Sequence, residues 1–355
     1  MFTQAFQLVE EFVTSRDTSG AVALIGYEGK TSGPKAFGNL SFFPHTEPVT
    51  ADTIFDLASL SKVVGTTTIT LKLIEEGLIS LSDSLGKLIP TAPQDKSKIT
   101  IQELLTHTSG LPAVYPLYQD ARFRNKETAL ETVLKVPLSY ATGSAVEYSC
   151  VGFITLGLVL EKLTGLPLDE LFHEYVAEPL NLQNTSYGVP FEKLNRTAYT
   201  EWDPDGKVFL RGMVHDENAR GLGGVSGNAG LFSTASDLGI FCEMLLQEGS
   251  YRGIQVLQPT TLALLQKNYT PDPSEPRTLG WLLPSPQGCS GSELISPHSV
   301  GHTGFTGTSI WIDFSRRFYG ILLTNRVHPS RVNTALIQLR PKFYRAICQA
   351  IEGAN

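Results

Sequence analysis

The alternation of apolar and polar positions predicts helices near both chain ends, with strands next to them. Residues 2–13 carry apolar side chains every three or four positions with acids between them, the period of an amphipathic helix. Residues 21–30 and 35–43 are short strand-like runs separated by Gly and Pro, which predicts an antiparallel hairpin. Residues 309–326 predict two more strands joined by a turn, and residues 334–353 predict a closing helix.

The middle of the chain has a helical pattern. Residues 60–78 are long and apolar enough for a helix that Gly77 is placed to end. From about residue 99 to 200 the pattern stays mainly helical, with Thr100 at a plausible N-cap position. A glycine-rich, polar loop region follows at 214–234, and then a capped helix at 236–249.

This order of elements predicts two lobes. Residues 1–57 and 230–355 would form an α/β lobe from both ends of the chain, and residues 58–229 a mainly helical lobe inserted between them. A cleft between two such lobes is a common place for a ligand.

Composition and charge exclude several classes of function. The 355 residues carry a formal charge of −7 with a pI near 5.6, and no basic stripe is present, so we expect no nucleic-acid partner. No apolar stretch approaches the roughly 20 residues of a membrane helix, so we expect no membrane partner. The N-terminus lacks the pattern of a signal peptide, and we expect a cytoplasmic protein unless a leader was removed. The four cysteines form no Cys-x-x-Cys pair, which fits reduced thiols and gives no zinc motif. The oligomeric state stays open.

The pattern Ser-x-x-Lys occurs at three places: Ser32/Lys35, Ser59/Lys62 and Ser84/Lys87. The first and third copies contain Gly and lie at or near Pro, so we expect neither to form a regular helix with facing side chains. The second copy opens the long helix predicted over 60–78. Residues three apart on a helix share one face at about 5–6 Å, so only this copy fixes the geometry of the pair.

Serine and lysine in this arrangement suit nucleophilic catalysis. A serine hydroxyl is a poor nucleophile until a base removes its proton. Lys62, one turn away in an apolar helix, would be desolvated, which favours the neutral amine that can act as this base. Ser59 at a helix N-terminus would also have backbone N–H groups near a developing oxyanion. On this segment alone, a capping serine with a solvent-facing lysine is the alternative.

Two further segments resemble motifs of a known enzyme superfamily. Tyr148-Ser149-Cys150 precedes a long helix, and the segment 301–312, GHTGFTGTSIWI, runs into a strand. With Ser59/Lys62 they resemble the Ser-x-x-Lys, Tyr-x-Asn and Lys-Thr-Gly or His-Thr-Gly motifs of the serine β-lactamase and penicillin-binding-protein superfamily. The resemblance covers about residues 20–345 and includes the branch of class C β-lactamases, D-alanyl-D-alanine carboxypeptidases and family VIII-type esterases.

The resemblance implies an α+β, β-lactamase/transpeptidase-like fold, with an antiparallel sheet flanked by helices, an inserted all-helical lobe and an active site in the cleft. It makes Ser59 the acylated nucleophile, Lys62 its proton acceptor and Tyr148 a second acid/base. Tyr148 needs a lowered pKa for this, for which Lys62 and His302 are the candidate cations. The oxyanion hole would be the backbone N–H groups of Ser59 and Phe305. Neither a cofactor nor a metal is implied.

The His302-Thr303-Gly304 segment would line the substrate site, with Gly304 allowing close approach of substrate backbone. Two residues depart from the common pattern. Cys150 stands where the family usually has an amide-reading Asn, and His302 replaces the Lys of most β-lactamases. Both departures favour an esterase-type hydrolase of small acyl substrates, with ester, amide and β-lactam preference left open. A true β-lactamase or a D-Ala-D-Ala carboxypeptidase/D-aminopeptidase is the alternative, and a non-turning-over penicillin sensor is an alternative of another class.

Other motifs carry weaker hypotheses. The adjacent His215, Asp216 and Glu217 suggest a metal, but neighbouring loop residues rarely converge on one ion. The glycines of 221–230 lack the spacing of a nucleotide loop, and no Gly-x-Ser-x-Gly elbow is present. We expect His107 to be a structural residue at a helix end.

Overall fold

A five-stranded antiparallel sheet forms the centre of the computed structural model, which describes residues 1–43, 46–270, 275–285 and 289–354. Its strand order is β10-β11-β12-β1-β2, so the first and last strands of the chain are neighbours. Ala21 on β1 lies opposite Thr324 on β12. The strands are β1 Gly20–Tyr27, β2 Lys30–Gly38, β10 Ser299–Thr303, β11 Ser309–Asp313 and β12 Phe318–Thr324.

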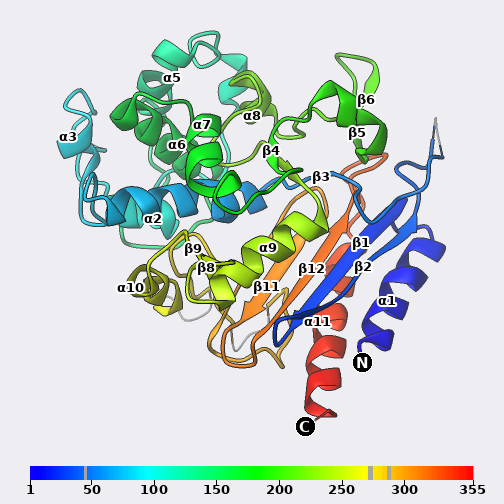
Figure 1. Cartoon of the computed structure of the whole chain (residues 1–355). Coiled ribbons are helices and arrows are strands. Elements are labelled where there is room, and N and C mark those ends of the chain that lie inside the picture. Colours follow the sequence, from blue (N-terminus) through cyan, green and yellow to red (C-terminus); the bar gives the residue numbers. More distant parts are fainter. Residues whose placement is uncertain (44–45, 271–274, 286–288, 355) are drawn as a thin grey trace.

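Helices cover both faces of this sheet (Figure 1). α1 (Thr3–Thr14) and α11 (Leu336–Glu352) pack together on one face, and α9 (Ala235–Leu246) lies on the other. Successive side chains of a strand point to opposite faces, and β1 is apolar at every such position. Its Ala21, Ala23 and Ile25 join the core on the α1/α11 side, and Val22 and Leu24 join the core under α9.

The first hairpin forms as predicted, but its turn lies earlier in the chain. β2 begins at Lys30, because Glu28 and Gly29 both adopt positive φ angles (48° and 73°) in a two-residue turn. The Gly33–Pro34 pair, expected to lie between the strands, lies inside β2, where the pairing register shifts between Ala23 and Ile25. A β-bulge accommodates the proline there.

The segment between β2 and β10 is mostly helical. The helix predicted over 60–78 is present as a π-helical stretch, η1 (Lys62–Thr67), that continues into α2 (Thr68–Glu75), and Gly77 follows it at φ 73°. Thr100 caps α4 as expected, in a capping box with Glu103. The remaining helices are α3 Leu85–Leu88, α4 Ile101–Leu105, η2 Leu117–Gln119, α5 Lys126–Val133, α6 Cys150–Thr164, α7 Leu168–Phe172, η3 His173–Ala177, η4 Phe191–Arg196, α8 Glu217–Gly221, α10 Pro259–Leu262 and η5 Ala263–Gln266.

The inserted part is not all-helical, which corrects the expectation. Three strands lie within it: β4 Ser186–Tyr187, β5 Tyr199–Asp203 and β6 Val208–Arg211. β5 and β6 form a hairpin, and β4 joins a small sheet of order β3-β7-β4 with β3 Phe55–Asp56 and β7 Leu231–Ser233. Such short strands leave too few residues for a clear alternation in the sequence. β8 Ser250–Tyr251 and β9 Ile254–Gln255 form a second hairpin.

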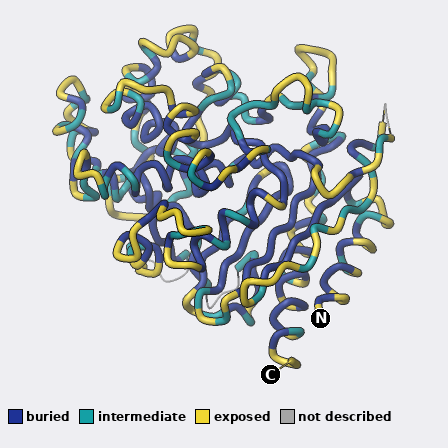
Figure 2. The backbone as a smooth tube through the Cα atoms, in the orientation of Figure 1, coloured by how far each residue is buried: buried dark blue, intermediate teal, exposed yellow. Residues whose placement is uncertain are grey.

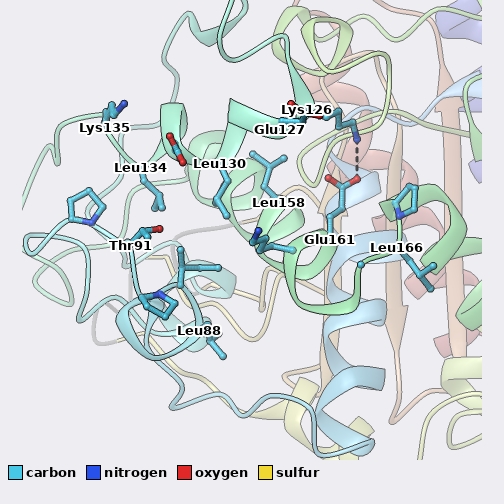
Figure 3. Close-up of a pocket in the computed structure, with 17 residues that line it drawn as sticks. Leu88, Thr91, Lys126, Glu127, Leu130, Leu134, Lys135, Leu158, Glu161 and Leu166 are labelled. Carbon is cyan, nitrogen blue, oxygen red and sulfur yellow. Dashed lines mark hydrogen bonds and ion pairs between the residues drawn. The ribbon is translucent and has the colours of Figure 1, made fainter.

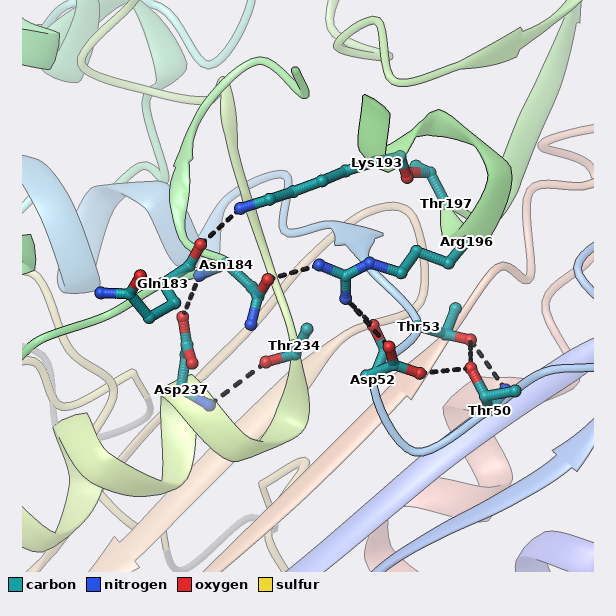
Figure 4. Close-up of polar contacts among 10 residues, drawn as sticks. All are labelled: Thr50, Asp52, Thr53, Gln183, Asn184, Lys193, Arg196, Thr197, Thr234 and Asp237. Carbon is teal, nitrogen blue, oxygen red and sulfur yellow. Dashed lines mark hydrogen bonds and ion pairs between the residues drawn. The ribbon is translucent and has the colours of Figure 1, made fainter. Parts of the chain in front are cut away.

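Polar contacts fix the small sheet against its surroundings (Figure 4). The Arg196 guanidinium donates to the backbone carbonyl of Asp52 and to the side-chain oxygen of Asn184, both at 2.5 Å. The Asn184 backbone N–H donates to Asp237 on α9 at 2.7 Å. These bonds tie the segment that leads into β4 both to the segment before β3 and to α9, and β3 in turn leads into Ser59.

Burial is continuous from the sheet into the helical part (Figure 2). Lys62 is among the largest fully buried side chains of the chain, together with aromatic residues. Within the described residues, no single helix has the length and apolar composition to span a membrane, although one bent pair does, α6 with α7 and η3 at 86°.

Candidate active site

Ser59 lies in the turn between β3 and the η1 helix. Ala58, just before it, has a positive φ of 47°, and its N–H donates to the buried carboxylate of Asp56 at 2.8 Å. Asp56 also accepts the N–H of His215 at 2.7 Å, so one carboxylate holds the turn on two sides. Ser59 is partly exposed, whereas Ser61 is fully buried and accepts the N–H of Leu231. Ser59 is therefore the serine that a substrate can reach.

Lys62 is buried directly beside Ser59. Its Nζ donates to Ser59 Oγ at 3.0 Å, to the Asn228 carbonyl at 3.0 Å and to Cys150 Sγ at 3.5 Å. These three acceptors match the three N–H donors of an ammonium group. Burial by itself lowers the pKa of Lys62, but the charges that Cys150 and Tyr148 carry when they are ionised raise it, and the net pKa lies above its usual value. The three acceptors around Nζ and the raised pKa favour the ammonium form, contrary to the expectation of a neutral resting amine.

Tyr148 lies against the same lysine. Its ring is 4.9 Å from Lys62 Nζ and 4.6 Å from the ring of His107, and its buried hydroxyl has Lys62 and Ser59 as polar neighbours. Burial raises the pKa of Tyr148, and the opposing charge of Lys62 only partly offsets this. The expected lowering is not found, because the phenolate loses more hydration than Lys62 returns. The resting pair is thus a phenol beside an ammonium group.

His302 lies on β10 and is neutral. Its Nδ1 donates to the carbonyl of Thr303 at 2.9 Å, which leaves Nε2 as a buried acceptor. Burial, with the charges of Lys62 and Arg277, holds the pKa of His302 well below its usual range. His302 therefore cannot be the second cation that was expected to act on Tyr148.

The turn after His302 is bonded to the strand before Ser59. Thr306 Oγ1 donates to the carbonyl of Asp56 at 2.6 Å, and Thr308 Oγ1 to that of Leu57 at 3.0 Å. A Cβ on Gly304 would meet the Leu57 carbonyl at 2.4 Å, so only glycine fits there. In the described chain the backbone N–H groups of Ser59 and Phe305 donate to no other group, which leaves both available for an oxyanion.

The other two Ser-x-x-Lys copies have structural roles. Ser32 lies on β2, and the side chain of Lys35 extends to α1, where its Nζ lies 4.4 Å from the Phe6 ring. Ser84 caps α3, and Lys87 pairs with Asp83. The third copy is helical after all, since Gly86 is tolerated in one short turn. What separates it from Ser59/Lys62 is its surface position.

His107 holds Tyr148 in place. Its Nδ1 accepts the N–H of Ser149 at 3.0 Å, and its ring packs on both Tyr148 and Phe153. Burial and nearby cations, Arg277 first, lower the pKa of His107 well below its usual range, so it is neutral. His107 is therefore a structural residue that packs against Tyr148.

The three adjacent residues of the metal hypothesis diverge. His215 Nε2 pairs with Glu201 at 2.9 Å, Asp216 caps α8, and Glu217 pairs with Arg331. The His215 ring also stacks on Phe305 at 5.6 Å, so this loop borders the site.

Two residues of the site were missed in the sequence. Asn228 comes from the glycine-rich segment 221–230 and supplies the carbonyl that Lys62 contacts. Arg277 is 3% exposed and stacks on the Tyr148 ring at 5.3 Å. The sequence signal for Arg277 is a single cation at the start of an apolar run, RTLGWLL, which is weak.

A cavity of about 1010 Å³ lies elsewhere, between the helices of the inserted part (Figure 3). Leucines 88, 130, 134, 158 and 166 line it, and Lys126 bridges to Glu161 at its rim. None of the residues around Ser59 lines this cavity, so it is separate from the site.

Comparisons with known proteins identify the family of this chain. A family model described as Beta-lactamase matches residues 5–341. An N-acetylmuramyl-L-alanine amidase of Bacillus subtilis (strain 168) is 32% identical over 347 residues, covering 87% of this chain and 77% of the amidase. A putative D-alanyl-D-alanine carboxypeptidase of Salmonella typhimurium is 31% identical over 328 residues, covering 84% and 75% of the two chains.

Solved structures with this fold span almost the whole chain. EstCE1, a hydrolase with promiscuous acyltransferase activity, aligns with a TM-score of 0.76 at 23% identity, covering 98% of both chains. A class C beta lactamase from Rhodobacter sphaeroides aligns with a TM-score of 0.77 at 19% identity, covering 98% of this chain and 99% of that one. At these identities the likeness establishes the fold and nothing finer.

Proposed function

The chain belongs to the beta-lactamase family of hydrolases, and we propose that it is a serine acyl hydrolase working through an acyl-enzyme on Ser59. One observation carries this proposal. The partly exposed Ser59 hydroxyl lies 3.0 Å from the buried Nζ of Lys62, in contact distance for proton transfer.

Acylation requires that the pair of Lys62 and Tyr148 first lose one proton, because the resting pair holds both. Ser59 Oγ then attacks the substrate carbonyl carbon, its proton passes to the pair, and the carbonyl electron pair moves onto oxygen. The N–H groups of Ser59 and Phe305 would hold this oxyanion. On collapse, the bond to the leaving oxygen breaks, and the pair returns the proton to the leaving group.

Deacylation repeats these steps with water in place of Ser59. The deprotonated pair takes a proton from water, the hydroxide oxygen attacks the acyl carbonyl, and Ser59 Oγ leaves as it regains a proton. Tyr148 can exchange protons in both acylation and deacylation, because it lies beside Lys62.

Small activated esters are the substrate class that the site suits best. Cys150 offers a thiol where an amide side chain would read the acylamide of a peptide or β-lactam. The neutral His302 adds no charge for a substrate carboxylate. An ester also has a better leaving group than an amide, so it depends less on these missing contacts.

A second candidate is the hydrolysis of an amide or peptide bond to an alanine residue. The names of the amidase and carboxypeptidase relatives favour it. A panel of p-nitrophenyl butyrate, D-amino-acid amides, D-Ala-D-Ala peptides and nitrocefin, compared by kcat/KM, separates the two candidates. Faster turnover of nitrocefin than of the ester would contradict both and favour a β-lactamase.

The nucleophile is tested by Ser59→Ala, with Ser61→Ala as the matched control. We expect Ser59→Ala to abolish turnover and covalent labelling by a phosphonate ester, because the attacking oxygen is gone. Ser61→Ala should keep the label, since this hydroxyl is fully buried against β7. A label that persists in Ser59→Ala would refute the assignment. A stoichiometric burst without steady turnover in the wild type would favour the penicillin sensor.

The role of Tyr148 is tested by Tyr148→Phe, which keeps the ring and removes the hydroxyl. If Tyr148 serves mainly in deacylation, the acyl-enzyme should accumulate and appear as added mass on the intact protein. A variant that neither slows turnover nor traps the adduct would exclude this role.

A further inference from the structure

Arg277 is built into the wall of the site by its backbone. Its N–H donates to Thr270 Oγ1 at 3.0 Å, and it forms a β-bridge with Leu282. Leu282 in turn bridges to Gly301 on β10, the residue before His302. A short hairpin-like segment thus fastens Arg277 to the edge of the strand that borders the substrate site.

The guanidinium group is buried with only part of its hydrogen-bonding capacity used. Its Nη2 pairs with Glu275, whose side chain is 43% exposed, whereas the Arg277 side chain is 4% exposed. Among the described residues, its Nε and Nη1 have no hydrogen-bond partner. A charged donor that is buried without a hydrogen-bond partner destabilises the folded chain. Such groups, with perturbed electrostatics, cluster at functional sites.

What the guanidinium faces is Tyr148. It lies 5.3 Å from the centre of the Tyr148 ring, while Lys62 lies 4.9 Å from the same centre. Two cations therefore lie close to the Tyr148 ring. Arg277 also acts on both nearby histidines, and its charge contributes to keeping His107 and His302 neutral.

We propose that Arg277 is a positioning residue that acts through Tyr148, its fixed charge stabilising the phenolate form on which proton transfer depends. Arg277 thereby supplies the permanent positive charge beside β10 that His302 does not. This rests on the proposed acyl-enzyme function, in which Tyr148 exchanges protons. The other charged or titratable groups around this centre are Lys62, Cys150, His107, His302, Asp216, Glu275 and Arg340.

The experiment compares the pH profile of kcat/KM for a neutral ester in the wild type, Arg277→Gln and Glu275→Gln. In Arg277→Gln the rising alkaline limb of the profile should move to higher pH by about one unit. At a given pH on that limb, kcat/KM should therefore fall about tenfold. Glu275→Gln removes the negative charge that pairs with Arg277, so the positive charge acts more strongly on Tyr148 and the limb should move to lower pH. Arg252→Gln is the matched control, because Arg252 stacks on Tyr251 at 5.2 Å on the surface.

An ultraviolet difference titration of tyrosinate, with Tyr148→Phe as the reference, measures the same shift without turnover. It separates failure of this inference from failure of the proposed function, because it needs no substrate. An equal loss of kcat/KM at every pH in Arg277→Gln, or an unmoved tyrosinate titration, would overturn the proposal. If Arg277→Gln does not fold, Glu275→Gln still tests the proposal. An alkaline limb of the pH profile that stays in place or moves to higher pH in Glu275→Gln contradicts the proposal.

Discussion

Thr306 gives the sharpest test of how the oxyanion hole is held. Its hydroxyl donates to the Asp56 carbonyl at 2.6 Å, and both residues are buried. Phe305, whose N–H would face the oxyanion, is the residue just before it, and Asp56 is three residues before Ser59. Thr306→Val keeps the shape of the side chain and removes this one bond between the two halves of the hole.

The expected magnitude follows from the cost of one buried hydrogen bond. Removing the donor from a buried carbonyl costs about 1–3 kcal/mol, which corresponds to about 5- to 150-fold if expressed fully in the transition state. Deleting a whole oxyanion donor costs about 10²–10³ in kcat, which sets the upper limit. Because Phe305 would be displaced and not deleted, we expect kcat to fall about tenfold, with KM changed by less than about twofold.

Steady-state kinetics with p-nitrophenyl butyrate and thermal unfolding provide the measurement. Thr132→Val is the matched control, because this buried threonine on α5 also donates to a backbone carbonyl, at 2.8 Å, away from the site. The control should lose stability and keep its kcat. If Thr306→Val keeps the wild-type kcat while its unfolding temperature falls as in the control, Thr306 stabilises the fold and does not place Phe305.

Two further predictions concern protonation and substrate choice. Because the pKa values of Lys62 and Tyr148 are both raised, the pair loses its proton only at high pH, so kcat/KM for a neutral ester should keep rising above about pH 8. A plateau reached below that pH, with the enzyme still folded, would show that the base has a lowered pKa. Cys150→Asn restores an amide that can bond an acylamide side chain and should raise the ratio of nitrocefin to ester turnover by about 2- to 13-fold. Cys150→Ala is its control, and an equal rise there would assign the change to space and not to the hydrogen bond.

Local patterns were sufficient for much of the fold. The helices at both ends follow from an apolar period of 3.6, and the pairing of β11 with β12 follows from two short apolar runs joined by a turn, neither of which needs knowledge of the rest of the chain. The prediction failed where elements are short. β4, β5 and β6 hold two to five residues each, and they went unnoticed within a region that was expected to be all-helical.

The candidate site divides in the same way. Ser59 and Lys62 could be found in the sequence because one helical turn sets their distance, and motif order pointed to Tyr148 and His302. Asn228 and Arg277 could not, since each comes from a segment that only tertiary packing brings to Ser59. The direction of the pKa shifts of Lys62 and Tyr148 also depends on the folded structure. A lysine alone in an apolar helix would be neutral, but Lys62 lies among Ser59, Cys150 and Asn228, and burial of Tyr148 outweighs the nearby cation. Residue types and their spacing determine which chemistry is possible, whereas protonation depends on every charge and every lost water around a group, and those are set in three dimensions.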